Sequence, residues 1–187
     1  MGTLATRSSQ SMDLVVGQQL AAAGQYLTFV LGGEVYALGI LNIKEIIDYG
    51  NLTEVPMMPV FVRGVINLRG SVVPVIDLLA RFGKGVTMIA KRTGIVIVET
   101  SVGDNDDNRQ YLGIIVDAVN EVVEIAGHEI EPPPSFGAGI RPDFINGMAK
   151  RDNRFVILLN VDKVLSVDEM AALGQAADHI PGNAFAE

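Results

Sequence analysis

Apolar residues along the chain occur in short runs that are separated by glycine, proline or acidic residues. Several of these runs alternate with polar positions, and all are short, so we expect β-strands rather than long helices. The expected strands cover residues 26–31, 35–39, 64–68, 72–77, 95–100, 111–116 and 155–161. Residues 41–47 are ambiguous, because the spacing of their apolar positions also fits a helical turn that leads into a strand.

Turn and cap residues between these strands predict how they are connected. Gly32-Gly33-Glu34 and Arg69-Gly70-Ser71 have the composition of tight hairpin loops. Residues 78–82 are expected to form one short helical turn. The S-x-x-E pattern that starts at Ser166 is a capping box, which predicts a C-terminal helix over residues 166–176.

The second half of the chain repeats the first. The matching segments are residues 43–47 with 119–123, 64–66 with 147–149, and 73–77 with 158–162. A spacing of about 75–85 residues suits a duplicated small domain rather than a solenoid. Halves of about 70 residues fit two five-stranded barrels, and because each would be marginally stable alone, we expect the two to pack on each other.

Composition and charge exclude several classes of protein. Of the 187 residues, 49% are hydrophobic, which is ample for a core, and there is no cysteine for disulfides or thiol chemistry. The apolar runs are much shorter than the roughly 18 residues that span a bilayer, and the N-terminus lacks a secretion signal. The net charge of −8 disfavours nucleic acid and anionic membranes as partners. We therefore expect a cytoplasmic protein.

Catalytic and metal-binding patterns are missing from the sequence. His128 lies in a polar loop and His179 in the C-terminal tail, so neither is placed for a catalytic triad. Residues 104–108 invite comparison with a calcium loop, but the positions that require Gly and Glu hold Arg109 and Ile115. We expect no enzymatic activity, no metal and no cofactor.

Three aspartates follow apolar runs and could suggest acid–base chemistry: Asp77, Asp117 and Asp162. In the repeat, Asp77 corresponds to Asp162, and each precedes an expected helical turn. Capping of those turns explains the pair better than catalysis does.

One motif occurs in only one half of the repeat. Residues 67–70 read Asn-Leu-Arg-Gly, whereas residues 150–153 read Lys-Arg-Asp-Asn. A hairpin tip needs only Asn, Gly or Ser, so Arg69 calls for another explanation. Its guanidinium could hold a carboxylate or carbonyl of a partner bidentately. An internal ion pair, with Glu45 as the candidate acid, explains it equally well.

Residues 64–78 resemble the signature of the CheW family of chemotaxis coupling proteins. Similar landmarks occur at Val35-Tyr36-Ala37-Leu38, Lys44-Glu45-Ile46, Gly113-Ile114-Ile115-Val116-Asp117 and Glu169-Met170. The resemblance implies an all-β fold of two SH3-like five-stranded β-barrels sharing a hydrophobic core, with short helices. It places the domain at residues 25–173, with barrels at about 25–85 and 92–165, a helix at about 166–176, and tails at 1–24 and 177–187.

The resemblance also implies a role. Proteins of this family are non-catalytic adaptors that link the cytoplasmic tips of methyl-accepting chemoreceptors to the regulatory domain of the histidine kinase CheA. They alternate with that domain in rings that build receptor arrays. This implies no small-molecule substrate and no insertion into the membrane.

Candidate binding residues follow from the same resemblance. A receptor helix lies in a groove between the barrels in this family, and the matching positions are Ile43, Glu45, Val65, Asn67, Leu68 and Arg69, with Val119 on the second wall. Phe136 matches an aromatic residue at the ring contact with the kinase. Nearby, Glu131 stands where some members carry a basic residue, so charge pairing at that contact differs here.

Two other functions remain open. The same module occurs in CheV-type adaptors and at the regulatory end of CheA, but the chain leaves no room for a receiver or kinase domain after the last expected helix. A small-ligand-binding β-barrel would gather convergent polar groups in one pocket. The sequence motifs do not supply such a set.

Overall fold

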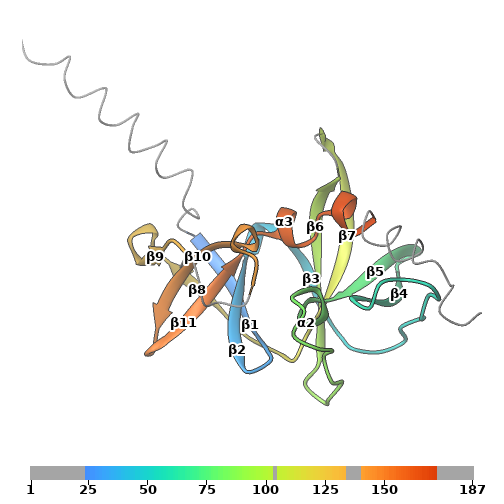
Figure 1. Ribbon diagram of the computed structural model, residues 1–187, viewed down its shortest axis with the longest axis horizontal. Coiled ribbons are helices and arrows are strands. Elements are labelled where there is room, and N and C mark those ends of the chain that lie inside the picture. Colours follow the sequence, from blue (N-terminus) through green and yellow to red (C-terminus); the bar gives the residue numbers. More distant parts are fainter. Residues whose placement is uncertain (1–23, 103–104, 134–139, 172–187) are drawn as a thin grey trace, which may run out of the picture.

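Two β-sheets lie side by side and make up most of the protein (Figure 1). The computed structural model describes residues 24–102, 105–133 and 140–171. The six-stranded sheet has the order β8 (Ala118–Ile125), β1 (Gly24–Leu31), β2 (Glu34–Gly39), β11 (Arg154–Leu159), β10 (Ile145–Arg151) and β9 (Ile130–Glu131). The five-stranded sheet has the order β3 (Ile43–Asp48), β6 (Gly94–Val102), β7 (Asn105–Val116), β5 (Ser71–Asp77) and β4 (Val62–Leu68). The all-β prediction is confirmed.

Short helical turns connect the strands. They are η1 (Ile40–Asn42), α2 (Leu78–Arg81), η2 (Gly127–Glu129), η3 (Pro142–Phe144) and α3 (Val161–Val164), and residues 167–171 are also helical. The turn-then-strand reading of residues 41–47 is confirmed by η1 and β3, and the predicted turn at 78–82 by α2. The predicted tails at 1–24 and 177–187 lie almost entirely outside the described residues.

The two halves of the chain are interleaved, which differs from the expected division into barrels at 25–85 and 92–165. The β1–β2 hairpin of the first half belongs to the sheet that holds β8 to β11, and the β6–β7 hairpin of the second half belongs to the sheet that holds β3 to β5. Parallel pairing of β2 with β11 and of β5 with β7 makes these exchanges. Each half therefore completes the sheet of the other. The backbone groups at the edge of a hairpin need hydrogen-bond partners, and strands of the other half provide them as well as strands of the same half would.

The predicted repeat is visible in matching details of the two sheets. β4 and β10 both shift register just before a glycine, at Gly64 and at Gly147. Asp77 and Asn160 both precede a short helix, with φ −90° and ψ 104° in each case. The structural counterpart of Asp77 is thus Asn160. The sequence alignment with Asp162 was wrong by two residues.

The shared hydrophobic core that was expected lies between the two sheets. It combines side chains from β1 and β2, such as Phe29 and Tyr36, with side chains from β6 and β7, such as Val96 and Ile114. Each of these four is at most 1% exposed. Two smaller clusters, one inside each sheet, complete the packing. Both halves therefore contribute side chains to one common core.

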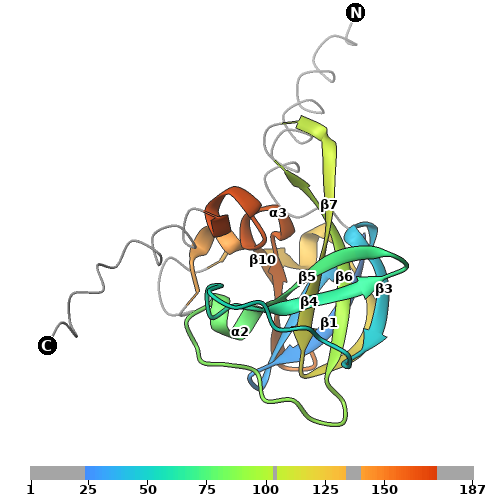
Figure 2. The ribbon, with the colours of Figure 1, turned by 90° about the vertical axis from the view of Figure 1, so that its right-hand side faces the viewer.

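The β6–β7 hairpin is longer than the sequence indicated. The predicted strands ended at residue 100 and began again at residue 111, whereas pairing continues out to Val102 and Asn105. Figures 1 and 2 both show this hairpin extending beyond the other strands. The sequence predicted a loop at its polar tip. A strand is recognised in a sequence by alternating apolar and polar residues, and this alternation is lost where both faces of the strand are in solvent.

Candidate partner-binding site

Arg69 in the β4–β5 turn and Glu45 on β3 form a bidentate ion pair, which joins the two ends of the five-stranded sheet. Arg69 Nη1 lies 3.1 Å from Glu45 Oε1, and Arg69 Nη2 donates to Oε2 at 3.1 Å. The Arg69 side chain is 79% exposed and that of Glu45 is 26% exposed. The internal ion pair considered from the sequence therefore exists, and it is open to solvent. The two planar groups remain accessible to a partner that offers its own carboxylate, carbonyl or amide.

The turn between β4 and β5 fixes the position of Arg69. Arg69 has φ 52° and Gly70 has φ 87°, as expected for the two central residues of a type I′ hairpin turn. The backbone N–H of Gly70 donates to Asn67 Oδ1 at 2.8 Å, which closes the turn. A non-glycine residue with positive φ is uncommon, so Arg69 occupies a position where Asn or Gly would fit more easily. Its side chain, rather than its backbone preference, accounts for its presence.

A depression of about 290 Å³ lies beside this ion pair. It is lined by Lys44, Glu45, Leu68, Arg69, Ser71, Ile97 and Tyr111. Lys44 lies 3.4 Å from Glu99 and 5.8 Å from the centre of the Tyr111 ring, so a cation, an anion and an aromatic face adjoin the Glu45–Arg69 pair. All the lining residues belong to the five-stranded sheet or its hairpin turn.

The structure brings only part of the predicted receptor set into this depression. Glu45, Leu68 and Arg69 line it. Asn67 is exposed and Val65 is half-buried on one face of β4, since burial alternates along the strand and Gly64 and Ile66 are the buried positions.

Two further members of the set lie on the core between the sheets. Ile43 at the start of β3 and Val119 on β8 are both half-buried and pack against the shared core. They come from different sheets, and neither lines the depression beside Arg69.

The predicted ring-contact residues are described only in part. Glu131 is exposed on the two-residue strand β9, where it pairs with Met148 on β10. Phe136 lies outside the described residues. The approach of β9 to β10 is close, since a Cβ at Gly147 would lie 3.1 Å from the Glu131 carbonyl oxygen.

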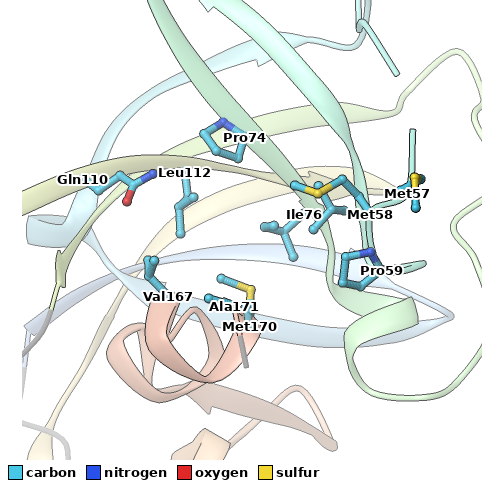
Figure 3. A pocket seen from close by; sticks show the side chains of 11 residues that line it. Met57, Met58, Pro59, Pro74, Ile76, Gln110, Leu112, Val167, Met170 and Ala171 are labelled. Carbon is cyan, nitrogen blue, oxygen red and sulfur yellow. The ribbon is translucent and has the colours of Figure 1, made fainter. Parts of the chain in front are cut away.

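An apolar groove of about 320 Å³ lies between the five-stranded sheet and the C-terminal helical residues (Figure 3). Figure 3 shows Met57, Met58 and Pro59 on one side of it and Val167, Met170 and Ala171 on the other. Met57 is 86% exposed, so its side chain is available to a partner. Methionine side chains adapt to varied apolar surfaces. The pairing of these two segments could not be read from the sequence, because they are more than a hundred residues apart.

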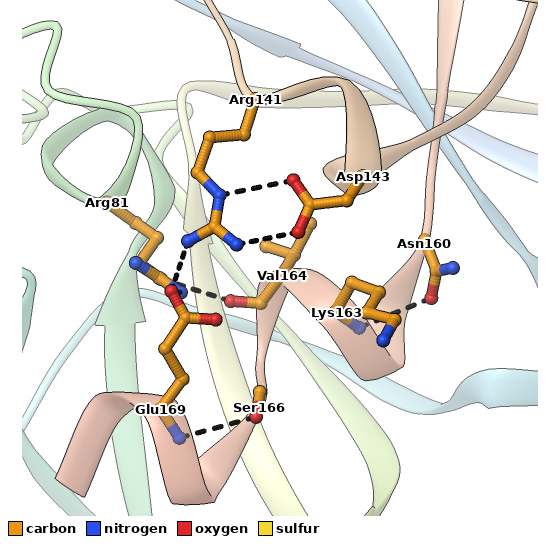
Figure 4. Close-up of polar contacts among 8 residues, drawn as sticks. All are labelled: Arg81, Arg141, Asp143, Asn160, Lys163, Val164, Ser166 and Glu169. Atoms are coloured by element: carbon orange, nitrogen blue, oxygen red, sulfur yellow. Dashed lines mark hydrogen bonds and ion pairs between the residues drawn. The ribbon is translucent and has the colours of Figure 1, made fainter. Parts of the chain in front are cut away.

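A network of charged residues fixes the helical residues 167–171 to the rest of the protein (Figure 4). Glu169 forms ion pairs with Arg81, at 3.2 Å, and with Arg141. Arg81 also donates from Nε to the Val164 carbonyl at 3.2 Å. Arg141 in turn pairs with Asp143 at 2.6 Å. The sequence predicts that Glu169 belongs to a capping box. The backbone N–H of Glu169 does donate to Ser166 Oγ, but its carboxylate points to the two arginines.

These contacts set the ionisation of the two acids. Burial opposes the ionised form of Glu169, but hydrogen bonds from Arg141 and Arg81 outweigh it and hold the pKa of Glu169 below its usual range. A hydrogen bond from Arg141 lowers the pKa of Asp143. The Arg81 guanidinium also lies over two aromatic rings, at 5.4 Å from the centre of Phe61 and 4.8 Å from that of Phe144.

Asp77 organises a second polar cluster, and it is completely buried. It caps α2 by accepting hydrogen bonds from the backbone of Leu79 and Ala80, as predicted. It also accepts from Arg63 Nη1 at 3.1 Å, and from both N–H and Oγ1 of Thr87 at 2.8 Å. The capping role predicted for Asp162 is wrong: this residue lies inside α3 and accepts from Thr100 and Ser101.

Other kinds of site are missing from the part of the chain that the structure describes. No three His, Asp or Glu residues there are arranged to hold a metal ion. His128 is exposed in η2. None of the described helices has the length and apolar character needed to span a bilayer.

Comparison with known proteins decides the family. A family model described as a CheW-like domain matches residues 25–169. The chain belongs to the CheW-like family. Chemotaxis protein CheW of Klebsiella aerogenes is 32% identical over 177 residues, which cover 95% of this chain and 98% of that protein. Chemotaxis protein CheW of Helicobacter pylori is 33% identical over 171 residues, covering 86% and 99% of the two chains.

A solved structure shows the same fold. The scaffolding protein TtCheW from Thermoanaerobacter tengcongensis has 38% sequence identity and a TM-score of 0.68, covering 78% of this chain and 90% of the other. This CheW-like chain therefore has the fold of a known scaffolding protein.

Proposed function

We infer that this CheW-like chain is a non-catalytic adaptor that couples chemoreceptors to the histidine kinase CheA in cytoplasmic chemotaxis arrays. Membership of a family whose named relatives are chemotaxis proteins supports this role. The described residues expose several large apolar side chains, which suit the binding of protein partners. The role therefore depends on binding two partners at once.

The receptor-binding surface comprises Ile43, Glu45, Val65, Asn67, Leu68, Arg69 and Val119. A helix docking on a groove gains affinity from apolar contacts and register from a few charged groups. Leu68 and the neighbouring Tyr111 supply apolar area, and the Glu45–Arg69 pair supplies the charges. Glu131 and Phe136 form the ring contact with the kinase regulatory domain.

The exposed Glu45–Arg69 pair is the observation that carries the proposal. A guanidinium that is 79% exposed on a turn with positive φ contributes little to stability, since exposed ion pairs add about 0–1 kcal/mol. A partner that enters the depression can bind either member of the pair without unfolding anything. Recognition of a partner explains the residue at this position better than stability does.

Reconstitution tests the proposal. CheA and a receptor signalling fragment are mixed with and without this protein, and kinase autophosphorylation and co-sedimentation are measured. We expect kinase activity to respond to the receptor fragment only when this protein is present. Equal receptor control of the kinase in its absence would show that the protein is not the coupling component.

A further inference from the structure

The connection between α2 and β6 carries a surface that includes none of the proposed receptor-binding or ring-contact residues. We call residues 84–92 the basic loop. It exposes three apolar side chains, Met88 at 87%, Val86 at 47% and Ile89 at 43%. Figures 1 and 2 show the connection between α2 and β6 looping out below the sheets, away from the β4–β5 hairpin that holds Arg69.

The basic loop has the opposite charge to the rest of the protein. The chain carries 22 acidic and 14 basic residues. Residues 78–98 nevertheless contain no acid and four bases, namely Arg81, Lys84, Lys91 and Arg92. Arg81 forms an ion pair with Glu169, and Lys84 lies 3.9 Å from Glu34. Within the described residues, neither Lys91 nor Arg92 has an acid within ion-pair distance, and both are exposed.

Buried hydrogen bonds hold the basic loop in place. Thr87 is 2% exposed and donates twice to Asp77, while its carbonyl accepts from Arg63 Nη1 at 3.2 Å. At the far end, Thr93 Oγ1 accepts from the backbone N–H of Ala90 at 2.8 Å. The side chains on either side of Thr87 are therefore presented to solvent by a fixed backbone. A partner that binds them loses little entropy in ordering the loop.

A cavity of about 370 Å³ adjoins the exposed side chains and can receive an apolar anchor. It is lined by Leu79, Val86, Thr87, Met88, Ala90, Thr93 and Asp117. The carboxylate of Asp117 is already engaged, since it accepts from the backbone N–H of Gly32 at 2.8 Å. The loop thus combines an apolar hollow with two exposed cations, Lys91 and Arg92, which lie in sequence between its lining residues Ala90 and Thr93.

We propose that the basic loop is a second docking surface, which binds an acidic amphipathic segment of a protein partner. Unpaired Lys91 and Arg92 complement acidic side chains, and the cavity receives an apolar one. A flat anionic membrane fits less well, because it would bring negative charge against the whole footprint of a protein whose net charge is −8. A peptide segment, in contrast, would place its acidic side chains only beside Lys91 and Arg92.

The test uses two synthetic amphipathic peptides and the full-length protein labelled with ¹⁵N. The first peptide carries leucine and glutamate at helical spacing, and in the second each glutamate is replaced by lysine. We expect the acidic peptide to shift the amide resonances of residues 84–93 and the lysine peptide to leave them unchanged. Shifts that fall elsewhere, or equal shifts with both peptides, would overturn the proposal.

Charge-reversal variants distinguish peptide binding at the basic loop from a general electrostatic attraction between the peptide and the protein. The double variant Lys91→Glu with Arg92→Glu should weaken acidic-peptide affinity on the order of tenfold. The matched control is Lys150→Glu with Arg154→Glu, which makes the same charge change at exposed positions of the six-stranded sheet and should have a much smaller effect. Equal weakening by both would refute a local site. Thermal melts confirm that all variants are folded.

A second pair of variants tests the apolar contact. Met88→Ser should weaken peptide binding, whereas Met57→Ser, at a methionine exposed to nearly the same extent, should not. Vesicles of phosphatidylglycerol provide the membrane alternative. Binding to vesicles that depends on Lys91 and Arg92, without binding of the acidic peptide, would replace the proposed partner with a lipid surface.

Discussion

Asp77 and Asn160 occupy equivalent places in the two halves of the fold and have the same backbone angles, yet they hold different numbers of partners. Both cap a short helix with a side-chain oxygen. Asn160 does little more, whereas Asp77 is fully buried and also binds Arg63 and Thr87. The side chain at this position is therefore a helix cap in one repeat, and both a helix cap and the anchor of a loop in the other.

Replacing Asp77 with Asn should separate the two roles. The amide keeps Oδ1, which caps α2 and accepts from Thr87 Oγ1, but its NH2 group cannot accept from Arg63 Nη1 or from the Thr87 N–H, so these two hydrogen bonds are lost. We expect a loss of about 3 kcal/mol in the free energy of unfolding, measured by urea denaturation. The reverse change, Asn160→Asp, should cost far less. A similar small loss in both variants would contradict this account.

Replacing Arg69 with Ala should weaken binding of a receptor signalling fragment without unfolding the protein. Loss of a bidentate contact at the centre of an interface costs about 2 kcal/mol or more of binding free energy. Because the Glu45 pair is exposed, we expect a stability loss of no more than about 1 kcal/mol. Calorimetric titration measures the first quantity and thermal melts the second.

The control for Arg69 is Arg154→Ala, which removes an exposed arginine at the start of β11 in the other sheet. Its affinity for the receptor fragment should equal that of the unmodified protein. Unchanged affinity in the Arg69 variant would remove Arg69 from the receptor surface.

Phe136→Ser should spare the binary complex with CheA but prevent assembly of rings. The resemblance places this aromatic residue at the contact between the second barrel and the kinase, where a buried ring contributes much of the binding energy. Pull-down with CheA measures the binary complex, and cryo-electron tomography of cells measures the arrays. Intact arrays would show that ring assembly depends on other residues.

Gly64→Ala should destabilise the five-stranded sheet. Gly64 has φ 152°, and a Cβ there would lie 2.3 Å from the Thr53 carbonyl oxygen. That carbonyl accepts from the Val65 backbone N–H at 2.8 Å, so the clash breaks the bridge between the β3–β4 connection and β4. We expect a loss of at least about 2 kcal/mol in denaturant unfolding. Gly50→Ala, where a Cβ would meet no atom within 4 Å, should be nearly neutral.

Glu169→Gln should reduce stability at neutral pH and lose its effect in acid. The folded-state pKa of Glu169 is held below its usual range, so its ionised form stabilises the fold. That contribution is fully present above the unfolded carboxyl pKa of about 4.3 and disappears as pH falls through the lower folded value. We expect a loss of roughly 1 kcal/mol at pH 7 that vanishes in strong acid.

Unfolding curves across this pH range provide the measurement for Glu169. Asp168→Asn, at the exposed neighbouring position, is the matched control and should change stability little at any pH. A difference between Glu169→Gln and the unmodified protein that stays constant down to strong acid would exclude the ion pairs with Arg81 and Arg141 as its cause.

Local signals in the sequence were enough to predict most strands and their turns. The positive φ of Gly70 and the cap at Asp77 depend on residues next to them in the chain, so their chemistry can be read directly. The repeat was also visible, because the glycine bulges at Gly64 and Gly147 recur with similar neighbours. Membership of the CheW-like family followed from the same stretch of residues.

The candidate site was predictable only in part. Arg69 stood out because a hairpin tip does not need an arginine, and Glu45 was named as a possible acid for it. The sequence could not choose between a partner contact and an internal pair, since both require the same two residues. The structure shows the pair formed and exposed. The assignment of Ile43, Val65, Asn67, Leu68 and Val119 to a receptor surface stays a prediction.

By itself the sequence determined the all-β class, the duplicated unit and the unusual arginine, because periodicity, turn preference and side-chain chemistry are properties of neighbouring residues. Only the tertiary structure decided that the halves exchange hairpins, and that Arg81 and Arg141 converge on Glu169. These contacts join residues far apart in the chain, and edge strands can pair with several partners. The pairings that form are those that bury one common core between the two sheets. The choice among alternative strand pairings therefore depends on the whole chain and cannot be read from a local sequence pattern.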